Sequence, residues 1–259
     1  MSGYDCKSET ALQTMDHANR VVRKILDEMA RRATPGVSTA DLDAYAESRL
    51  AEEGVQPAFK GYRGFPAVLC TSVNDEVVHG IPSRKKRLRE GDLLSLDFGA
   101  VADGFYADAA VTITVGKGSD EARRLIEITR ESLLRGIEQV RAGNRIQDIS
   151  RAVQTHVESA GFSVVREFVG HGIGRSLHED PQVPNFVSGG PNPKLHPGLV
   201  LAIEPMVSAG RPEVQVDPND RWTARTQDGS LSAHWELSVA VTENGPWVLG
   251  EPEPMRAVS

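Results

Sequence analysis

The sequence predicts an α+β protein made of two related halves, in which each half supplies two helices before its strands. An offset of 107 residues carries three glycines onto three others: Gly36, Gly54 and Gly91 onto Gly143, Gly161 and Gly198. In each half, two stretches with helical spacing precede apolar, strand-like runs. We therefore predict a single domain over 1–259 with halves of about 10–116 and 117–250, and a chance match of amphipathic helices is the alternative.

The first helix is predicted from about Glu9 to Arg32, because its apolar residues recur at helical spacing. Ser38 or Thr39 can cap a second helix, which Gly54 closes. The corresponding helices of the second half are predicted over about Asp120–Arg141 and Ile146–Ala160. The pattern is therefore a helix pair in front of each set of strands.

The segment Asp92–Val115 is predicted to form a hairpin, because Asp103-Gly104 suits the positive φ of a tight turn. Asp97 and Asp108 lie on either side of that turn, eleven residues apart. An odd separation across a two- or four-residue turn points both side chains to the same face of the sheet. We expect these two acids to lie close together.

Two glutamates stand in similar strand-like runs of the second half. Glu204, in LVLAIEPMV, lies 107 residues after Asp97, and Glu236 lies in AHWELSVAV. The segment Arg211–Gly229, rich in Pro, Asp and Asn, is predicted to be the loop between these strands. Because this loop is long, spacing alone does not fix the face on which Glu236 lies.

A fold that gathers these four acids is expected to bind metal ions. Carboxylates a few ångströms apart repel one another by about 4 kcal/mol at an effective dielectric constant of about 20. Oxygen ligands with an imidazole suit Mn, Fe, Co or Zn, and the sequence does not choose among them. Two such ions can hold a hydroxide whose pKa is lowered from about 15.7 toward 7, which favours hydrolysis of an amide or ester.

Three histidines stand in settings that suggest a functional role. His79 lies in VVHGIPS, and His171 and His178 lie in VGHGIGRSLHED. Neighbouring glycines allow close approach of a ligand, and a neutral imidazole can bind metal or donate to a developing oxyanion. The other four are assigned to the surface or to packing: His17, His156, His196 and His234.

Composition narrows the class and the compartment. The formal net charge of −7 argues against specific nucleic-acid binding. No apolar stretch is long enough to span a bilayer and no signal-type segment is evident, so we expect a cytoplasmic protein and a monomer. Cys6 and Cys70 are predicted to be free thiols. The basic run Arg84–Arg89 is predicted to be a solvated loop, with a transient ribosome contact as the alternative.

Five segments give the chain a specific resemblance to a known family. They are GYRGFPAVLCTSVNDEVVHGIPS, GDLLSLDFGAVADGFYADAAVTITVG, VGHGIGRSLHEDP, LAIEPMV and DGSLSAHWELSVAVTE. Together they resemble type I methionine aminopeptidases, whose pita-bread fold is shared with prolidases and creatinases. The resemblance covers about residues 10–250. It implies a single catalytic pita-bread domain, with a central antiparallel sheet and two helix pairs on its outer face.

The resemblance also implies a role for each candidate residue. Five residues are implied as ligands of two divalent ions: Asp108 and Glu236 as bridges, Asp97 on one ion, and His171 and Glu204 on the other. Glu204 is also implied to orient the attacking water. His79 and His178 are implied to contact the substrate amide. The implied methionine pocket consists of Phe59, Tyr62, Phe65, Cys70 and Trp222.

The implied activity is removal of the initiator methionine from nascent chains when the second residue is small. Three positions depart from the family pattern, which usually has His at 237, often Phe at 177 and often Tyr at 65: here they are Leu237, Leu177 and Phe65. Two rivals stay open, an Xaa-Pro peptidase on the same fold and a metal-free binding module. All five implied ligand positions are filled, which favours the peptidase.

Overall fold

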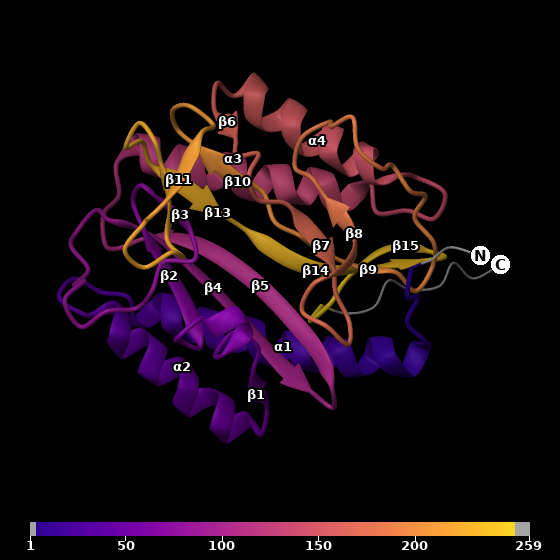
Figure 1. The fold of residues 1–259 in the computed structure, drawn as a ribbon, viewed down its shortest axis with the longest axis horizontal. Coiled ribbons are helices and arrows are strands. Elements are labelled where there is room, and N and C mark those ends of the chain that lie inside the picture. The colour runs from indigo at the N-terminus through magenta and orange to yellow at the C-terminus, as the bar shows by residue number, and fades with distance from the viewer. Residues whose placement is uncertain (1–3, 252–259) are drawn as a thin grey trace.

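A computed structural model describes residues 4–251 of the chain. Its centre is a nine-stranded antiparallel sheet in which the order is β1-β4-β5-β14-β9-β7-β8, with β2 on β4 and β15 on β14. The strands are β1 (Gln56–Pro57), β2 (Leu69–Val73), β4 (Leu93–Ala102), β5 (Phe105–Thr114), β7 (Gly170–Gly172), β8 (Glu179–Val183), β9 (Val200–Ile203), β14 (Glu236–Thr242) and β15 (Gly245–Val248). Figure 1 shows one helix pair on either side of these strands.

The first helix pair was predicted almost to the residue. Helix α1 (Glu9–Arg32) has the predicted bounds, and Ser8 caps it. Helix α2 (Thr39–Glu53) begins after Ser38, whose side chain forms a capping box with Asp41. Gly54 ends α2 with a φ of 70°, the left-handed conformation that glycine adopts at little cost.

The second pair follows the prediction with one error at an end. Helix α4 (Ile146–Ser159) matches to within one residue. Helix α3 (Asp120–Glu138) stops three residues before the predicted Arg141. The N–H of Gln139 bonds to Gly136 and that of Val140 to Ile137, so tight i→i−3 bonds end the helix there.

Both helix pairs pack on the same face of the sheet. Residues of α1, including Ile25 and Met29, share a buried cluster with Leu96 and Phe98 of β4. Ile137 of α3 shares another cluster with alternate residues of β9 and β14: Leu201, Ile203, Leu237, Val239 and Val241. Since side chains alternate along a strand, Asp97, Ala202, Glu236 and Ser238 point to the other face. The predicted α+β architecture with helices outside is confirmed, and the inner face is left for a site.

Local features recur at the offset of 107 residues. Ser38 forms an isolated β-bridge with Arg87, and Arg145 forms one with Lys194. The N–H of Gly36 donates to Leu88 at 2.8 Å and that of Gly143 to Leu195 at 3.0 Å. The φ angles of Gly36 and Gly143 are 93° and 92°. The division into two related halves stays a prediction that these features support.

The prediction that Arg211–Gly229 is a loop is wrong in part. It contains β11 (Val214–Val216) and β12 (Ala224–Thr226), which form a small sheet with β3 (Glu76–Val78). Asp220 accepts bonds from the N–H groups of Trp222 and Thr223, so an acidic side chain orders the turn between the strands. Polar composition indicated a loop, whereas the buried partner β3 selects strands.

A third sheet lies at the same end, in the order β13-β10-β6. Its strands are β6 (Ser163–Val164), β10 (Met206–Ser208) and β13 (Ser232–His234). A short 3₁₀ turn covers Tyr62–Gly64. Within residues 4–251 no helix combines the length and apolarity that crossing a membrane requires.

Candidate metal centre and substrate cavity

A cavity of about 160 Å³ opens on the inner face of the sheet. Its lining includes every residue that the sequence singled out: Phe59, Tyr62, Phe65, Cys70, His79, Asp97, Asp108, His171, His178, Glu204, Trp222 and Glu236. Five further residues complete it: Arg63, Val78, Phe168, Val169 and Leu177. The structure thus brings all twelve candidates to one place.

Strand register explains why three acids meet. Ala110 of β5 pairs with Asp97 of β4 on one side and with Glu236 of β14 on the other. Asp108 is two residues from Ala110 and therefore points to the same face. The three carboxylates project from adjacent strands over the small side chain of Ala110, and the same-face prediction for Asp97 and Asp108 is confirmed.

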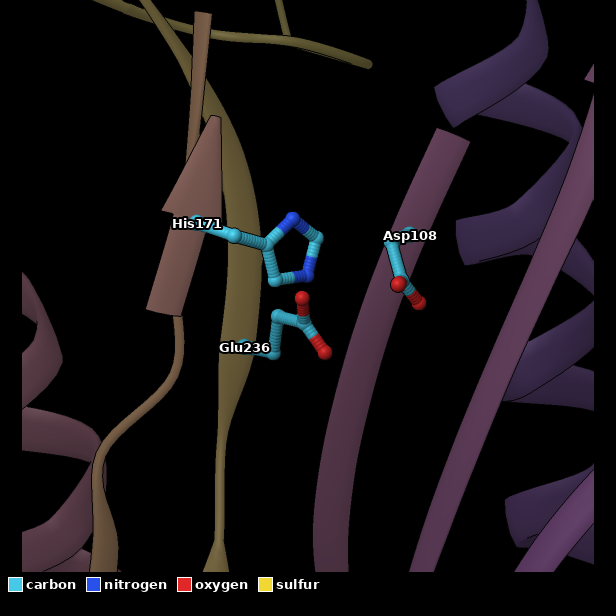
Figure 2. A group of neighbouring side chains, drawn as sticks. All are labelled: Asp108, His171 and Glu236. Atoms are coloured by element: carbon cyan, nitrogen blue, oxygen red, sulfur yellow. The ribbon is translucent and has the colours of Figure 1, made fainter. Parts of the chain in front are cut away.

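Register places His171 and Glu204 beside them. His171 of β7 pairs with Ala202 of β9, and Ala202 pairs with Ser238, two residues from Glu236. Glu204 follows β9, and its Oε1 lies 3.7 Å from Nε2 of His171. Figure 2 shows His171, Glu236 and Asp108 projecting from β7, β14 and β5 toward a common space. Ligand atoms of these three lie within 4.8 Å of one another.

The donor atoms fit a divalent cation. Among residues 4–251, Asp97 Oδ1, Asp108 Oδ1 and Glu236 Oε1 are buried oxygens without a hydrogen-bond partner. A buried carboxylate without a partner costs several kcal/mol, about as much as removing one member of a buried ion pair. Oxygen-rich donors with one imidazole suit a first-row divalent metal. Nothing else on the described chain compensates these charges.

Burial also raises the affinity of the acids for protons. Removal from water raises the pKa of Asp97 to about 7 and that of Glu204 to about 8. The same cause, with neighbouring carboxylates, holds the pKa values of Asp108 and Glu236 well above their ordinary range. Protons and cations therefore compete for one set of oxygens.

His171 is oriented for coordination by its own backbone neighbour. Its Nδ1 lies 2.9 Å from the carbonyl oxygen of Gly172, an acceptor, so the proton belongs on Nδ1. The Nε2 lone pair then faces the carboxylates. Burial lowers the pKa of His171 to about 3, which keeps the ring neutral.

His178 and Tyr62 form a second oriented pair. The Tyr62 hydroxyl lies 2.9 Å from Nδ1 of His178, and the two rings stack at 5.4 Å. His178 also contacts His171, with 4.1 Å between ring centroids. Burial lowers the pKa of His178. A neutral His178 that accepts from Tyr62 at Nδ1 carries its proton on Nε2, where it can donate to a substrate.

His79 and the aromatic residues form the wall of the cavity. His79 has a φ of 60°, a conformation that is uncommon outside glycine, and meets the rings of Phe168 and Trp222 edge-on. Burial lowers the pKa of His79 to about 4. Phe65 contacts Trp222 at 5.1 Å. The wall therefore joins the first part of the chain to the turn between β11 and β12.

Cys70 and Phe59 lie against the sheet beside the acids. Cys70 pairs with Asp97 across β2 and β4. Burial raises the pKa of its thiol well above the usual value, so the sulfur is a neutral, polarisable contact. Phe59 packs over Gly99, where an added Cβ would lie 2.8 Å from its ring. Cys6 and Cys70 are both free, as predicted.

His234 was assigned to the surface or to packing, and the structure places it in the donor cluster. Its side chain is buried, and Nε2 lies 3.5 Å from Oε2 of Glu204. It forms a second group of possible ligands with Glu204 and Glu236. The alternation His234-Trp235-Glu236, which puts the first and third side chains on one face, is the signal that could have found it.

Two of the departures from the family pattern fall in different places. Leu237 belongs to the apolar cluster on the helix side of the sheet, away from the cavity. Leu177 is buried and lines the cavity beside His178. Phe65, the third, is also buried in the lining.

Comparison with known proteins identifies the family. A family model, metallopeptidase family M24, matches residues 13–243. The chain belongs to this family, which is more than nine-tenths of its described length in agreement with the donor cluster. The site is therefore that of a hydrolase that uses divalent metal.

Named relatives agree. The chain is 50% identical over 243 residues to a methionine aminopeptidase of Clostridium acetobutylicum, covering 94% of this chain and 97% of the relative. It is 40% identical to the methionine aminopeptidase of Escherichia coli, covering 94% and 92%. The crystal structure of methionine aminopeptidase from Thermotoga maritima superposes with a TM-score of 0.93 at 43% identity, covering 96% of this chain and all of that one.

A more distant structure shows the fold alone. Prolidase from Pyrococcus furiosus gives a TM-score of 0.78 at 22% identity, and the match covers 96% of this chain but 66% of that one. The pita-bread fold that the sequence predicted is confirmed by these similarities.

Proposed function

We propose that this chain is a methionine aminopeptidase that removes the initiator methionine from nascent proteins when the second residue is small. The observation on which this depends is the set of unpartnered carboxylate oxygens on the floor of a cavity whose wall is aromatic and sulfur-containing. Acidic donors suit the cleavage chemistry, and the wall suits a thioether side chain. The names of the similar proteins support the same activity.

The proposed ligands hold two divalent ions. Asp108 and Glu236 bridge them, Asp97 completes one site, and His171 with Glu204 completes the other. Their oxygens converge from β4, β5, β14 and the end of β9, and His171 presents Nε2. When bound, such ions act as Lewis acids and lower the pKa of a coordinated water from about 15.7 toward 7. Mn, Fe, Co and Zn all suit this donor set.

The protein residues orient the substrate and move protons. Asp97 lies where a free α-amino group meets a carboxylate, which selects the chain terminus over an internal peptide bond. His178 donates from Nε2 to the carbonyl oxygen as negative charge develops there, because Tyr62 occupies its Nδ1. His79 contacts the amide from the opposite wall. Glu204 orients the attacking water and can accept its proton.

The methionine side chain is proposed to lie among Phe59, Tyr62, Phe65, Cys70 and Trp222. Four aromatic rings and a neutral thiol exclude water and offer sulfur–aromatic contacts worth about 0.3–1.5 kcal/mol each. Burial of the whole side chain adds about 1.5–3 kcal/mol. Binding of methionine in this pocket fixes the scissile carbonyl near His178.

The proposed setting of the reaction is the cytoplasm, where a monomer meets nascent chains and needs no specific nucleic acid. A transient ribosome contact through the run Arg84–Arg89 is part of the proposal. Arg84, Lys85 and Arg89 are exposed. Lys86 instead pairs with the buried Glu76 at 2.6 Å, and Arg87 donates to the carbonyl of Gly36. The exposed three are the residues that an anionic surface can reach.

Cleavage of matched dipeptides tests the proposal. Purified protein, supplied in turn with each of the four metals, is assayed with Met-Ala, Met-Leu and Ala-Pro peptides, and its metal content is measured. We expect rapid cleavage of Met-Ala, slow cleavage of Met-Leu and none of Ala-Pro, with close to two ions per chain. Preferred cleavage of Ala-Pro would establish an Xaa-Pro peptidase instead, and absence of metal binding would establish a binding module.

A further inference from the structure

Lys7 is a buried lysine that precedes the first helix and lies outside the part of the chain that the family model matches. Its side chain is 2% exposed. The Nζ atom donates to Oε2 of Glu179 at 2.5 Å and to the carbonyl of Asp5 at 2.9 Å. Its backbone N–H bonds to Gly198 at 2.7 Å, directly beside β9. Lys7 is therefore fixed to the sheet at its backbone and to Glu179 at its tip.

Glu179 connects this lysine to the loop that presents His178. The loop runs from Ile173 to His178, between β7 and β8, and Glu179 is the residue after His178. Oε1 of Glu179 accepts the N–H of Ser176 at 3.1 Å, so its carboxylate spans the loop while Oε2 holds Lys7. The far side of the loop is bonded separately, by the N–H of Tyr106 to Gly174.

Gly174 shows how closely Lys7 fits into this loop. A Cβ added at Gly174 would lie 2.1 Å from Cε of Lys7 and 2.7 Å from Oε1 of Glu179. The lysine stem thus occupies the space of a side chain at position 174. A bond between its tip and Glu179 limits movement of the residues between them.

Stability alone is a weak reason for such a pair. Removing both charges from water offsets most of their attraction, and well-packed apolar residues would often be at least as stable. The pair has one distinctive neighbour, His178, whose Nε2 must stay directed at the cavity. Misplacing a reacting group by about 1 Å can cost a hundredfold in rate.

We propose that Lys7 is a positioning residue, which through Glu179 holds the Ile173–His178 loop so that His178 keeps its place over the substrate carbonyl. The inference rests on the proposed aminopeptidase function. It adds to that function a requirement for the segment before α1. Lys7 itself does not touch the substrate.

Two variants and a matched control test this role. Lys7→Met keeps the length of the stem and removes the charge, and Glu179→Gln removes the opposite charge. Lys24→Met is the control, because it breaks the Lys24–Glu53 pair between α1 and α2, at 2.7 Å and remote from the cavity lining. The measurements are kcat and KM on Met-Ala, bound metal, and hydrogen exchange of the amides of residues 174–179 in metal-free protein.

For Lys7→Met we expect kcat to fall about tenfold or more, KM to change less than about threefold, and metal content to stay unchanged. Amide exchange in the loop should accelerate about tenfold, and Glu179→Gln should act in the same direction. The double variant should lose less than the two single losses added together, because both act through one contact. Lys24→Met should stay within about twofold of the parent protein.

The outcomes separate the two proposals. Unchanged kcat together with unchanged loop exchange in Lys7→Met overturns the role of Lys7. If Lys7→Met does not fold, the same result for Glu179→Gln overturns it. Lack of Met-Ala cleavage by the parent protein counts against the proposed function, and the exchange measurement still decides whether Lys7 holds the loop.

Discussion

Residues 36–97 and 143–204 are built alike, whereas the segments that follow them differ. The matched regions share a β-bridge, a helix start and a terminal acid, Asp97 in one and Glu204 in the other. After Asp97, a two-residue turn returns the chain directly to Asp108. After Glu204, the strands β10 to β13 intervene before Glu236.

The difference separates two tasks. The matched regions, with the strands beside them, bring acids to one face of the sheet. The unmatched segment supplies Trp222, which contacts Phe65 and His79 and so closes the aromatic wall. Repetition of a helix pair and a strand thus accounts for the donor cluster, and an addition to one region accounts for the fit of a substrate.

The largest expected effect comes from removing the two matched acids. Asp97→Ala and Glu204→Ala should each lower the rate on Met-Ala by more than about a hundredfold and reduce bound metal, because loss of a ligand exceeds the 10–100-fold effect of an outer contact. Asp103→Asn, in the turn of the same hairpin, is the control and should keep full rate and metal content. A variant that keeps full activity would separate its acid from the donor cluster.

The next effect is on stability and depends on pH and metal. The pKa values of Asp97 and Glu204 rise to about 7 and about 8 in the folded chain. The folded state therefore holds more protons than the unfolded state between about pH 4 and 8, and the free energy of unfolding of metal-free protein should fall across that window. We expect a loss of a few kcal/mol between pH 5 and 8, since each unit of pKa corresponds to about 1.36 kcal/mol.

Denaturant unfolding at both pH values, with and without manganese, measures this loss. Bound metal should remove most of the pH dependence, because the ligands stay deprotonated. Asp97→Asn and Glu204→Gln should each flatten the slope of the metal-free protein. Equal stability of the metal-free protein at pH 5 and pH 8 would contradict the buried, proton-binding cluster.

A smaller effect is expected from the unmatched segment. Trp222→Ala should raise KM for Met-Ala about tenfold, because it removes aromatic contacts worth about 1–2 kcal/mol, while bound metal stays the same. Val216→Ala, at an exposed position of the neighbouring strand, is the control. Loss of metal in Trp222→Ala would mean that the wall also supports the donors, and the two tasks would no longer be separate.

The sequence revealed the site where chemistry and periodicity act over short distances. Asp97 and Asp108 could be placed on one face because only a tight turn separates them. Glu236 could not, since its place depends on pairing with Ala110, more than a hundred residues earlier. His234 was missed for the same reason: nothing local distinguishes a histidine in a short strand until β13 packs against β10.

Secondary structure followed the same rule. Capping residues and glycines fixed α1 and α2, because their signals lie within a few residues of the helix ends. Segment 211–229 looked like a loop because its polar residues favour turns, and the strands within it depend on β3, far away in the chain. Local signals thus predict elements, and long-range pairing decides the remainder.

The smallest effects concern matched glycines. Gly36 and Gly143 have φ angles of 93° and 92°, and no atom lies within 4 Å of an added Cβ at either. Gly36→Ala and Gly143→Ala should therefore each cost about 1–2 kcal/mol of unfolding free energy, from backbone strain alone. Urea unfolding of metal-loaded protein measures both, and values more than about 1 kcal/mol apart would break the proposed equivalence.

Gly91 and Gly198 provide the sharper version of this comparison. Their φ angles agree, at 88° and 89°, but an added Cβ would lie 3.7 Å from the carbonyl oxygen of Lys117 at Gly91 and 2.7 Å from that of Lys7 at Gly198. Gly198→Ala should cost about 1 kcal/mol more than Gly91→Ala, because the clash adds to the strain. Equal costs would show that the segment around Lys7 yields easily, since only that segment distinguishes the two sites.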